Sequence, residues 1–391
     1  MRRALRMLVC AALAGGSFAC EERLEVLTAP DASPPSARSY STLAVGQTHA
    51  CAIRAGQIFC WGLGARGELG TGAVVPGALT PRRVAGLDTA ASVSSGEFHS
   101  CAIDRAGSVF CWGGNDQGQL GVLDFGDRLA PSRVDLSDAA SQLATSFLFS
   151  CAVLRDQSLW CWGRNFEGQL AQGDVPDETG IPTPTRVGSD RDWTHVSTGQ
   201  GHTCGIRAAG ALYCWGRNTE GELGVGAGAS IQIRRPTRVG DESDWQRVSA
   251  AENETCAIKT NGTLWCWGGN PDGQLGLGDH NRRDVPVRVG DQSAWDAVSL
   301  STFHACAIAR GELWCWGRNT EGQLGTGDGE DRLAPARAGE DADWSSVSTG
   351  RFFTCALKSN GSAWCTGAND EGQLGGGDRE RRFVLTPVAA D

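Results

Sequence analysis

The chain has 391 residues and a net charge of −10, with 54 glycines and 14 tryptophans but only 2 tyrosines. The acidic balance and the lack of a basic face argue against a protein that follows nucleic-acid phosphates. The 16 cysteines would indicate metal sites in a reducing compartment and disulfide bonds in an oxidising one.

The first segment, residues 1–20, has the pattern of an export signal. An arginine-rich start precedes a short apolar run, which is too short to cross a bilayer as a mature helix. The ending Ser17-Phe18-Ala19-Cys20 resembles a bacterial lipobox, in which Cys20 would be lipidated; plain secretion is the alternative. Residues 21–39 are rich in Pro, Ser and Ala and are typical of a flexible linker. We therefore expect an exported protein, either lipid-anchored in the bacterial cell envelope or secreted.

Residues 40–391 contain seven repeats with a period of 49–53 residues. Each repeat carries two cysteines, nine or ten positions apart. The first cysteines are Cys51, Cys101, Cys151, Cys204, Cys256, Cys306 and Cys355. The second cysteines are Cys60, Cys111, Cys161, Cys214, Cys266, Cys315 and Cys365. In the mature repeats no cysteine is left over.

Other positions repeat in step with the cysteines. A tryptophan follows the second cysteine in six repeats, and Thr366 replaces it in the seventh. A Gly-x-Asn-x-x-Gly-Gln-Leu-Gly segment comes next, as in residues 317–325, and then a Pro- and Arg-containing run such as residues 184–187. An aromatic residue precedes the first β-prone run, except where Ala90 and Ala140 stand in repeats two and three.

The signatures G-x-x-H-x-C/A-A-I and W-G-x-N-x-x-G-Q-L-G resemble those of the regulator of chromosome condensation (RCC1) repeat family. The resemblance covers all seven repeats and implies an all-β fold, a seven-bladed β-propeller. The residues agree independently, because each repeat has four short β-prone runs, enough for one four-stranded blade. The final run at residues 384–388 either completes the last blade or joins the first.

The cysteine spacing predicts one disulfide hairpin in each blade. If the two cysteines face each other on antiparallel strands, a spacing of ten leaves a three-residue loop that ends in glycine, such as Gly107. A spacing of nine leaves a two-residue loop such as Ala55-Gly56. Zinc held by His99 and its two neighbouring cysteines is the weaker alternative, because three of the seven repeats lack the histidine. The spacing also does not match a redox pair, so we expect neither a metal nor a cofactor.

Two further positions in each repeat do not follow the shared pattern. They lie between the first β-prone run and the histidine column, and we expect these turns to ring the mouth of the central channel. The turns contain four phenylalanines, which is unexpected unless these side chains pack inward or meet a partner. The predicted partner-binding residues are Gln47, Glu97, Phe98, Phe147, Leu148, Gln200, Glu252, Asn253, Phe303, Arg351 and Phe352.

No catalytic set of residues emerges, so we do not expect an enzyme. The leading hypothesis is an exported, monomeric interaction scaffold that binds an unknown protein or cell-surface macromolecule. It would bind no nucleic acid and would meet a membrane only through Cys20. In the resembling family, a secreted bacterial member holds an enzyme with aromatic residues on one propeller face, so inhibition of a secreted enzyme is one expected form. The alternatives are a secreted hydrolase or lyase and a purely structural module of the cell envelope.

Overall fold

The computed structural model divides the chain into two units, Met1–Ala37 and Arg38–Asp391. The described residues are 5–12, 18–25, 39–173 and 180–389. None of them belongs to a helix with the length and apolar character that a membrane span requires.

In the first unit, β1 (Leu5–Ala12) and β2 (Phe18–Glu25) pair as an antiparallel hairpin. The predicted export signal and most of the predicted linker (residues 21–39) fall on this unit. Much of both, including residues 26–38, lies outside the described residues. The export signal and the lipidation of Cys20 stay predictions.

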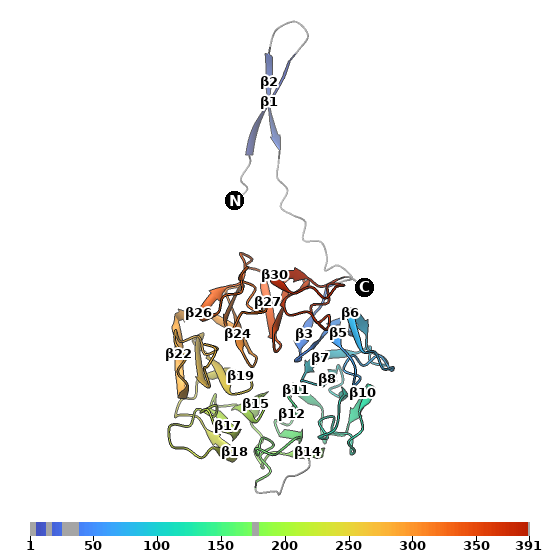
Figure 1. Cartoon of the computed structure of the whole chain (residues 1–391), viewed down its shortest axis with the longest axis vertical. Helices are drawn as coiled ribbons and strands as arrows, with labels where there is room; N and C mark the ends of the chain where they lie inside the picture. The colour runs from blue at the N-terminus through green and yellow to red at the C-terminus, as the bar shows by residue number, and fades with distance from the viewer. Residues whose placement is uncertain (1–4, 13–17, 26–38, 174–179, 390–391) are drawn as a thin grey trace. The chain divides into compact units, whose positions relative to one another are not determined.

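The second unit is a ring of seven four-stranded antiparallel sheets, so the predicted all-β seven-bladed propeller is confirmed (Figure 1). We number the blades 1 to 7 in chain order. The innermost strands are β3 (Thr42–Val45), β7 (Ala90–Ser95), β11 (Ala140–Thr145), β15 (Trp193–Thr198), β19 (Trp245–Ala250), β23 (Trp295–Leu300) and β27 (Trp344–Thr349). The second strands are β4 (His49–Arg54), β8 (His99–Asp104), β12 (Phe149–Leu154), β16 (His202–Arg207), β20 (Glu254–Lys259), β24 (His304–Ala309) and β28 (Phe353–Lys358).

The third strands are β5 (Gln57–Leu63), β9 (Val109–Gly113), β13 (Leu159–Gly163), β17 (Leu212–Arg217), β21 (Thr263–Gly268), β25 (Glu312–Gly317) and β29 (Ala363–Gly367). The outer strands are β6 (Gly77–Arg83), β10 (Arg128–Val134), β14 (Ile181–Arg186), β18 (Gln232–Arg238), β22 (Arg283–Ser293), β26 (Arg332–Arg337) and β30 (Arg382–Pro387). Six of the outer strands contain a proline in their interior, which lacks an N–H and so discourages pairing with another sheet edge.

The second and third strands of every blade are joined by the predicted disulfide. The paired cysteines are Cys51–Cys60, Cys101–Cys111, Cys151–Cys161, Cys204–Cys214, Cys256–Cys266, Cys306–Cys315 and Cys355–Cys365. Each pair is directly opposite in the strand register, as Cys101 is to Cys111. Closing a loop of this length stabilises a fold by about 2–3 kcal/mol in the chain-entropy model.

The hairpin loops have the conformations that the spacing predicts. Gly107 has φ +93° at the last position of its three-residue loop, while Ala55 and Gly56 have φ +52° and +82° in a two-residue loop. In repeat three Gln157 takes the same position with φ +61°, although a side chain makes that conformation less favourable.

A tryptophan fastens each of six blades to the blade before it. The indole N–H of Trp162 donates to the backbone oxygen of Gln119 in the preceding blade, over 2.9 Å. The same donation is made by Trp61, Trp112, Trp215, Trp267 and Trp316 over 2.8–3.0 Å. All six indoles are fully buried, so the tryptophans pack between blades.

The acceptor turn leaves room only for glycine beside the indole. A Cβ built on Gly121, which has φ +71°, would lie 2.8 Å from Nε1 of Trp162. In blade 7, where Thr366 replaces the tryptophan, the threonine hydroxyl lies 2.8 Å from the oxygen of Gly322 in the preceding blade. The shorter side chain thus makes an inter-blade hydrogen bond to the carbonyl one residue earlier in the same turn.

The ring closes without any exchange of strands between blades. β30 pairs with β29, so the C-terminal run completes the last blade. Blade 7 then contacts blade 1 directly: the N–H of Val45 donates to the hydroxyl of Ser348 over 3.0 Å. Equivalent serines join other inner strands, for example Ser94 with the N–H of Thr145 over 3.1 Å. The seam therefore has the same kind of contact as the other blade boundaries.

These contacts predict a specific cost for Trp162→Phe. The substitution removes the hydrogen bond to Gln119 and part of a fully buried side chain. We therefore expect the free energy of unfolding to fall by about 1–3 kcal/mol. Guanidinium unfolding of the oxidised protein measures this. Trp160→Phe is the matched control. Trp160 lies on the same strand and is partly exposed, and its indole N–H donates to the nearby Ser158. An equal loss in the two variants would contradict the inter-blade role of Trp162.

Candidate functional site

The seven inner strands end around a cavity at one mouth of the central channel. The cavity has an empty volume of about 590 Å³. Each blade contributes the first of its two non-repeating positions to the lining, in the order Gln47, Glu97, Phe147, Gln200, Glu252, Thr302 and Arg351. Because every blade has the same backbone there, side-chain identity alone decides what the mouth presents.

The second non-repeating position does not line this cavity. Phe98, Leu148, Asn253, Phe303 and Phe352 are half-buried beside it and form what we call the rim. The structure therefore divides the predicted partner-binding residues between the mouth and the rim.

The four phenylalanines form two ring pairs. Phe303 and Phe352 are stacked, with ring centroids 5.0 Å apart and planes at 15°. Phe98 and Phe147 are tilted at 55°, with centroids 6.4 Å apart. The first pair joins blades 6 and 7, and the second joins blades 2 and 3. One pair therefore lies on each side of the mouth, with blade 1 between them on one side and blades 4 and 5 on the other.

Arginines cover both pairs, a feature that the sequence analysis missed. The guanidinium of Arg318 lies 5.2 Å from the ring centre of Phe303, and Arg351 lies 5.4 Å from that of Phe352. On the other pair, Arg66 lies 5.6 Å from Phe98. Contacts of this kind contribute about 0.5–1 kcal/mol at exposed sites. The rings therefore present an aromatic and cationic surface.

One of these arginines had a signal in the sequence. Arg318 follows Trp-Gly directly, at a position that varies among the repeats within an otherwise constant signature. Arg164 occupies the same position and lies 5.6 Å from the ring centre of Phe147. A search for variable positions next to the constant ones would have found both.

The lining of the mouth holds two carboxylates and one guanidinium. Glu97 is partly buried, and its Oε2 has no hydrogen-bond partner among the described residues. The pKa of Glu97 is raised to about 7, mainly by burial; Arg351 opposes the shift and Glu252 adds to it. The charge of the mouth therefore changes near neutral pH.

Beneath the mouth, the histidine column forms hydrogen bonds between blades. Nε2 of His99 lies 2.9 Å from the hydroxyl of Ser150 in the next blade. His49, His202 and His304 make the same contact at 2.8 Å with Ser100, Thr255 and Thr354. Burial lowers the pKa of His49 to about 4 and that of each of the other three to about 3, so all four are neutral at pH 7. Their contacts are those of a structural network.

Three aspartates in the loops between the third and outer strands already have hydrogen-bond partners within the protein. Asp279 accepts a hydrogen bond from Arg283 over 2.7 Å and one from the N–H of Asn281 over 2.9 Å. Asp328 and Asp378 make the equivalent arginine contacts. Within the part of the chain that the structure describes, no group of three His, Cys, Asp or Glu side chains is placed to hold a metal ion.

Four-stranded blades, one disulfide hairpin per blade and a variable mouth define a closed propeller built from sequence repeats. A model of the RCC1-like domain matches residues 19–302, and models of the regulator of chromosome condensation (RCC1) repeat match residues 310–357 and 344–373. The chain belongs to the RCC1-like domain family.

Known relatives share part of this chain. The ultraviolet-B receptor UVR8 of Arabidopsis thaliana is 29% identical over 246 residues, which are 61% of this chain and 54% of the receptor. The probable E3 ubiquitin-protein ligase HERC6 of Homo sapiens is 28% identical over 238 residues, which are 59% of this chain and 18% of the ligase. The chain thus spans about half of the first protein and less than a fifth of the second.

Solved structures show the same fold. Prp20p of Saccharomyces cerevisiae, which has binding properties toward Gsp1p and histones, superposes with a TM-score of 0.75 at 22% identity, covering 88% of each chain. Human WBSCR16 superposes with a TM-score of 0.72 at 22% identity, covering 80% of this chain and 84% of the human one.

The histidine column also contains one carboxyl group, which predicts a pH effect on stability. Glu254 is fully buried, its Oε1 has no partner among the described residues, and burial raises its pKa well above the usual range. The folded chain therefore keeps a proton that the unfolded chain releases, so this group stabilises the fold at low pH and destabilises it as pH rises.

We expect Glu254→Gln to gain stability over the natural protein as pH rises from 5 to 8. Urea unfolding at both pH values measures the difference. Glu371→Gln, at a partly exposed carboxylate, is the control. Parallel pH profiles for the natural protein and Glu254→Gln would contradict the assignment.

Proposed function

We propose that this protein is a non-enzymatic interaction scaffold that holds another protein against the mouth and rim. One observation carries the proposal: the seven blades keep a common backbone, while the seven mouth positions on it carry five different kinds of side chain. A purely structural ring would not need variation at the one place where all blades converge.

The chemistry of the mouth and rim supports a protein partner. Aromatic side chains and arginines are the residues that most often dominate protein–protein binding energies. Here four phenylalanines and four arginines are held by their own packing, so little side-chain freedom would be lost on binding. Inhibition of a secreted enzyme is the form of this function that we favour, since a rigid rim can cover an enzyme's active-site opening.

We also propose that the protein is exported. The pattern of residues 1–20 supports this, as do the disulfides in all seven blades, since such bonds persist in oxidising compartments. Membrane attachment would come from a lipid on Cys20.

The rim proposal is tested by the double variant Phe303→Ala/Phe352→Ala. The tagged full chain is cross-linked on intact cells, and captured proteins are identified with and without the substitutions. We expect the variant to lose the captured partner, with at least about a tenfold weaker affinity once that partner is purified. Phe98→Ala/Phe147→Ala tests the second pair in the same way.

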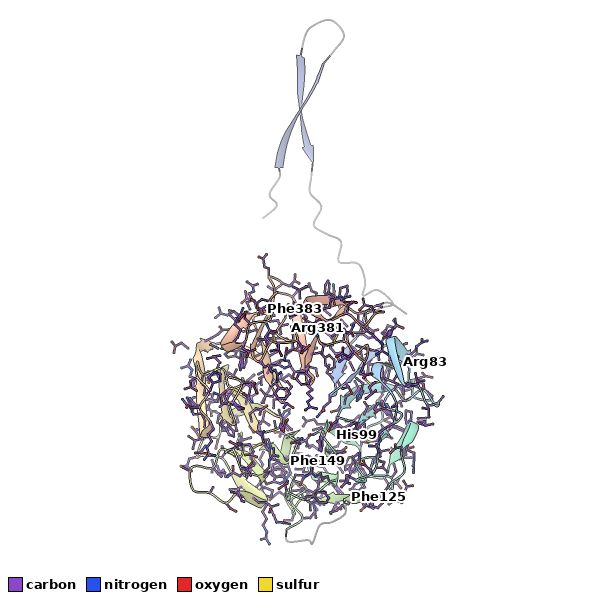
Figure 2. All side chains as sticks on the ribbon, viewed as in Figure 1. Arg83, His99, Phe125, Phe149, Arg381 and Phe383 are labelled. Atoms are coloured by element: carbon purple, nitrogen blue, oxygen red, sulfur yellow. A yellow bond between two sulfur atoms is a disulfide. The ribbon has the colours of Figure 1, made fainter. Side chains whose placement is uncertain are left out.

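Phe125→Ala is the matched control, because Phe125 is exposed but lies at the outer margin of the ring (Figure 2). Circular dichroism in the near ultraviolet checks that each variant is folded. Capture of the same partners at the same affinity by a folded Phe303→Ala/Phe352→Ala variant would overturn the role of that rim pair.

The lipid proposal has a separate test in a bacterial host. We expect the natural chain in the membrane fraction and Cys20→Ser in the aqueous fraction, because the substitution removes the thiol that would carry the lipid. An aqueous natural chain would refute lipidation, and a cytoplasmic chain would refute export.

A further inference from the structure

The stacked ring pair of blades 6 and 7 carries two guanidinium groups, and each of them contacts both rings. The guanidinium of Arg318 lies 5.2 Å from the ring centre of Phe303 and 5.7 Å from that of Phe352. The corresponding distances of Arg351 are 5.8 Å and 5.4 Å. Arg318 follows β25 in blade 6 and Arg351 precedes β28 in blade 7, so two neighbouring blades place two cations against one aromatic pair.

Neither guanidinium has a carboxylate of its own. Among the described residues, no acid forms an ion pair with Arg318 or with Arg351. Nε of Arg318 donates to the neutral hydroxyl of Thr320 over 3.0 Å, and the side chain of Arg351 donates no hydrogen bond to a described residue. Because each guanidinium has five N–H donors, most of the donors at this ring pair are unused by the part of the chain that the structure describes.

Three other arginines beside the mouth and rim differ, since each has a carboxylate of the chain as its partner. The pairs and their N–O distances are Arg66–Asp127 at 2.8 Å, Arg217–Glu222 at 2.9 Å and Arg164–Glu167 at 4.0 Å. The positive charge of these three arginines is thus compensated inside the molecule. The charge at the ring pair of blades 6 and 7 is not.

The ring pair and its arginines can be reached from solvent. Arg351 is exposed and lines the mouth cavity, while Arg318 and both phenylalanines are partly exposed. A guanidinium that stacks on an aromatic ring uses its face for the ring and keeps its N–H groups at the edge. The two oxygens of a carboxylate match this edge with two parallel hydrogen bonds. The site therefore offers the donors that a carboxylate ligand prefers.

The surrounding charges favour a ligand with a single negative charge. Partial burial raises the pKa values of Glu97 and Asp272, and the positive charges of Arg351 and Arg318, respectively, oppose the two shifts. The two carboxyl groups are thus within electrostatic reach of the arginines but do not pair with them. A doubly charged phosphate would be repelled by these acids more strongly than a carboxylate would.

We propose that Arg318 and Arg351, held on the stacked rings of Phe303 and Phe352, bind a carboxylate side chain of the partner protein. This inference rests on the proposed function and names the chemistry of the partner at one place on the rim. The guanidinium groups would hold the oxygens of an aspartate or glutamate, and the rings would contact its methylene groups. At the other ring pair Arg66 already binds a carboxylate of the chain, so the acidic part of the partner would face blades 6 and 7.

An acetylated and amidated tetraglutamate peptide is the first probe, and the arginine Nε–H signals of ¹⁵N-arginine-labelled full-length protein are the readout. We expect saturable shifts of the Arg318 and Arg351 signals, which the single variants Arg318→Gln and Arg351→Gln assign. We expect no shift with the uncharged tetraglutamine peptide and at least about fivefold weaker binding of inorganic phosphate. Equal shifts at all exposed arginines, or tighter binding of phosphate, would overturn the carboxylate site.

The double variant Arg318→Gln/Arg351→Gln removes the two charges and keeps both rings. We expect it to bind the partner captured by the natural chain at least about tenfold more weakly. Arg105→Gln/Arg155→Gln is the matched control, because it removes the same charge from two exposed residues in the hairpin loops at the opposite end of blades 2 and 3. We expect this control to change the affinity less than about twofold. Near-ultraviolet circular dichroism checks folding, and Arg351→Gln alone replaces the double variant if that variant is unfolded.

The two measurements separate this inference from the proposed function. A partner that Phe303→Ala/Phe352→Ala loses but that the folded arginine variant binds with unchanged affinity would overturn the carboxylate site and leave the rim as the binding surface. If the natural chain captures no partner, the proposed function is contradicted and the peptide titration alone decides the inference. In that case, unshifted Arg318 and Arg351 signals would overturn it.

Discussion

The structure depends on one buried backbone carbonyl in each blade. At Gln119 this oxygen accepts the indole N–H of Trp162 and the hydroxyl of Ser150, each over 2.9 Å, and that hydroxyl also contacts His99. A buried carbonyl must be satisfied, so the three side chains fix where the next blade can lie. The complete set recurs at Glu222, with Trp267, Thr255 and His202, and parts of it recur at the other blade boundaries. Because the blades are fastened below the surface, the mouth residues are free to vary.

Much of the fold could be predicted from the sequence, since the evidence for it is repeated seven times. The recurring spacing of nine or ten residues identified the facing cysteines, and the loop length that it leaves identified the left-handed positions at Gly107 and Gly56. The blade to which residues 384–388 belong could not be predicted, because β-propensity does not identify the strand with which a segment pairs. The register between β29 and β30 settles that question.

The candidate site was predictable only in part. Variation between repeats identified the mouth, because a position that changes while its neighbours stay constant stands out. This variation did not separate the mouth from the rim, because the direction of a side chain in these turns depends on side chains from two blades. The arginine beside Phe98 comes from an adjoining blade, 32 positions earlier in the chain, so no local pattern could have connected them.

The two ends of the blades carry different kinds of variation. At the mouth the side chains differ freely, whereas at the opposite end a ring and a basic residue are both present in blades 1, 4, 5 and 7 and both absent in blades 2 and 3. Linked loss of this kind marks residues that support one another.

The absence of strand exchange between blades has a consequence for how such a ring can grow. Each blade is a single continuous segment, and the contact between Ser348 and Val45 at the seam matches the contacts elsewhere. A duplicated stretch of gene that encodes one repeat therefore adds one complete blade and leaves every other sheet intact. The angle between neighbouring blades sets how many blades close the ring. A change in the number of repeats disrupts no strand that two blades share.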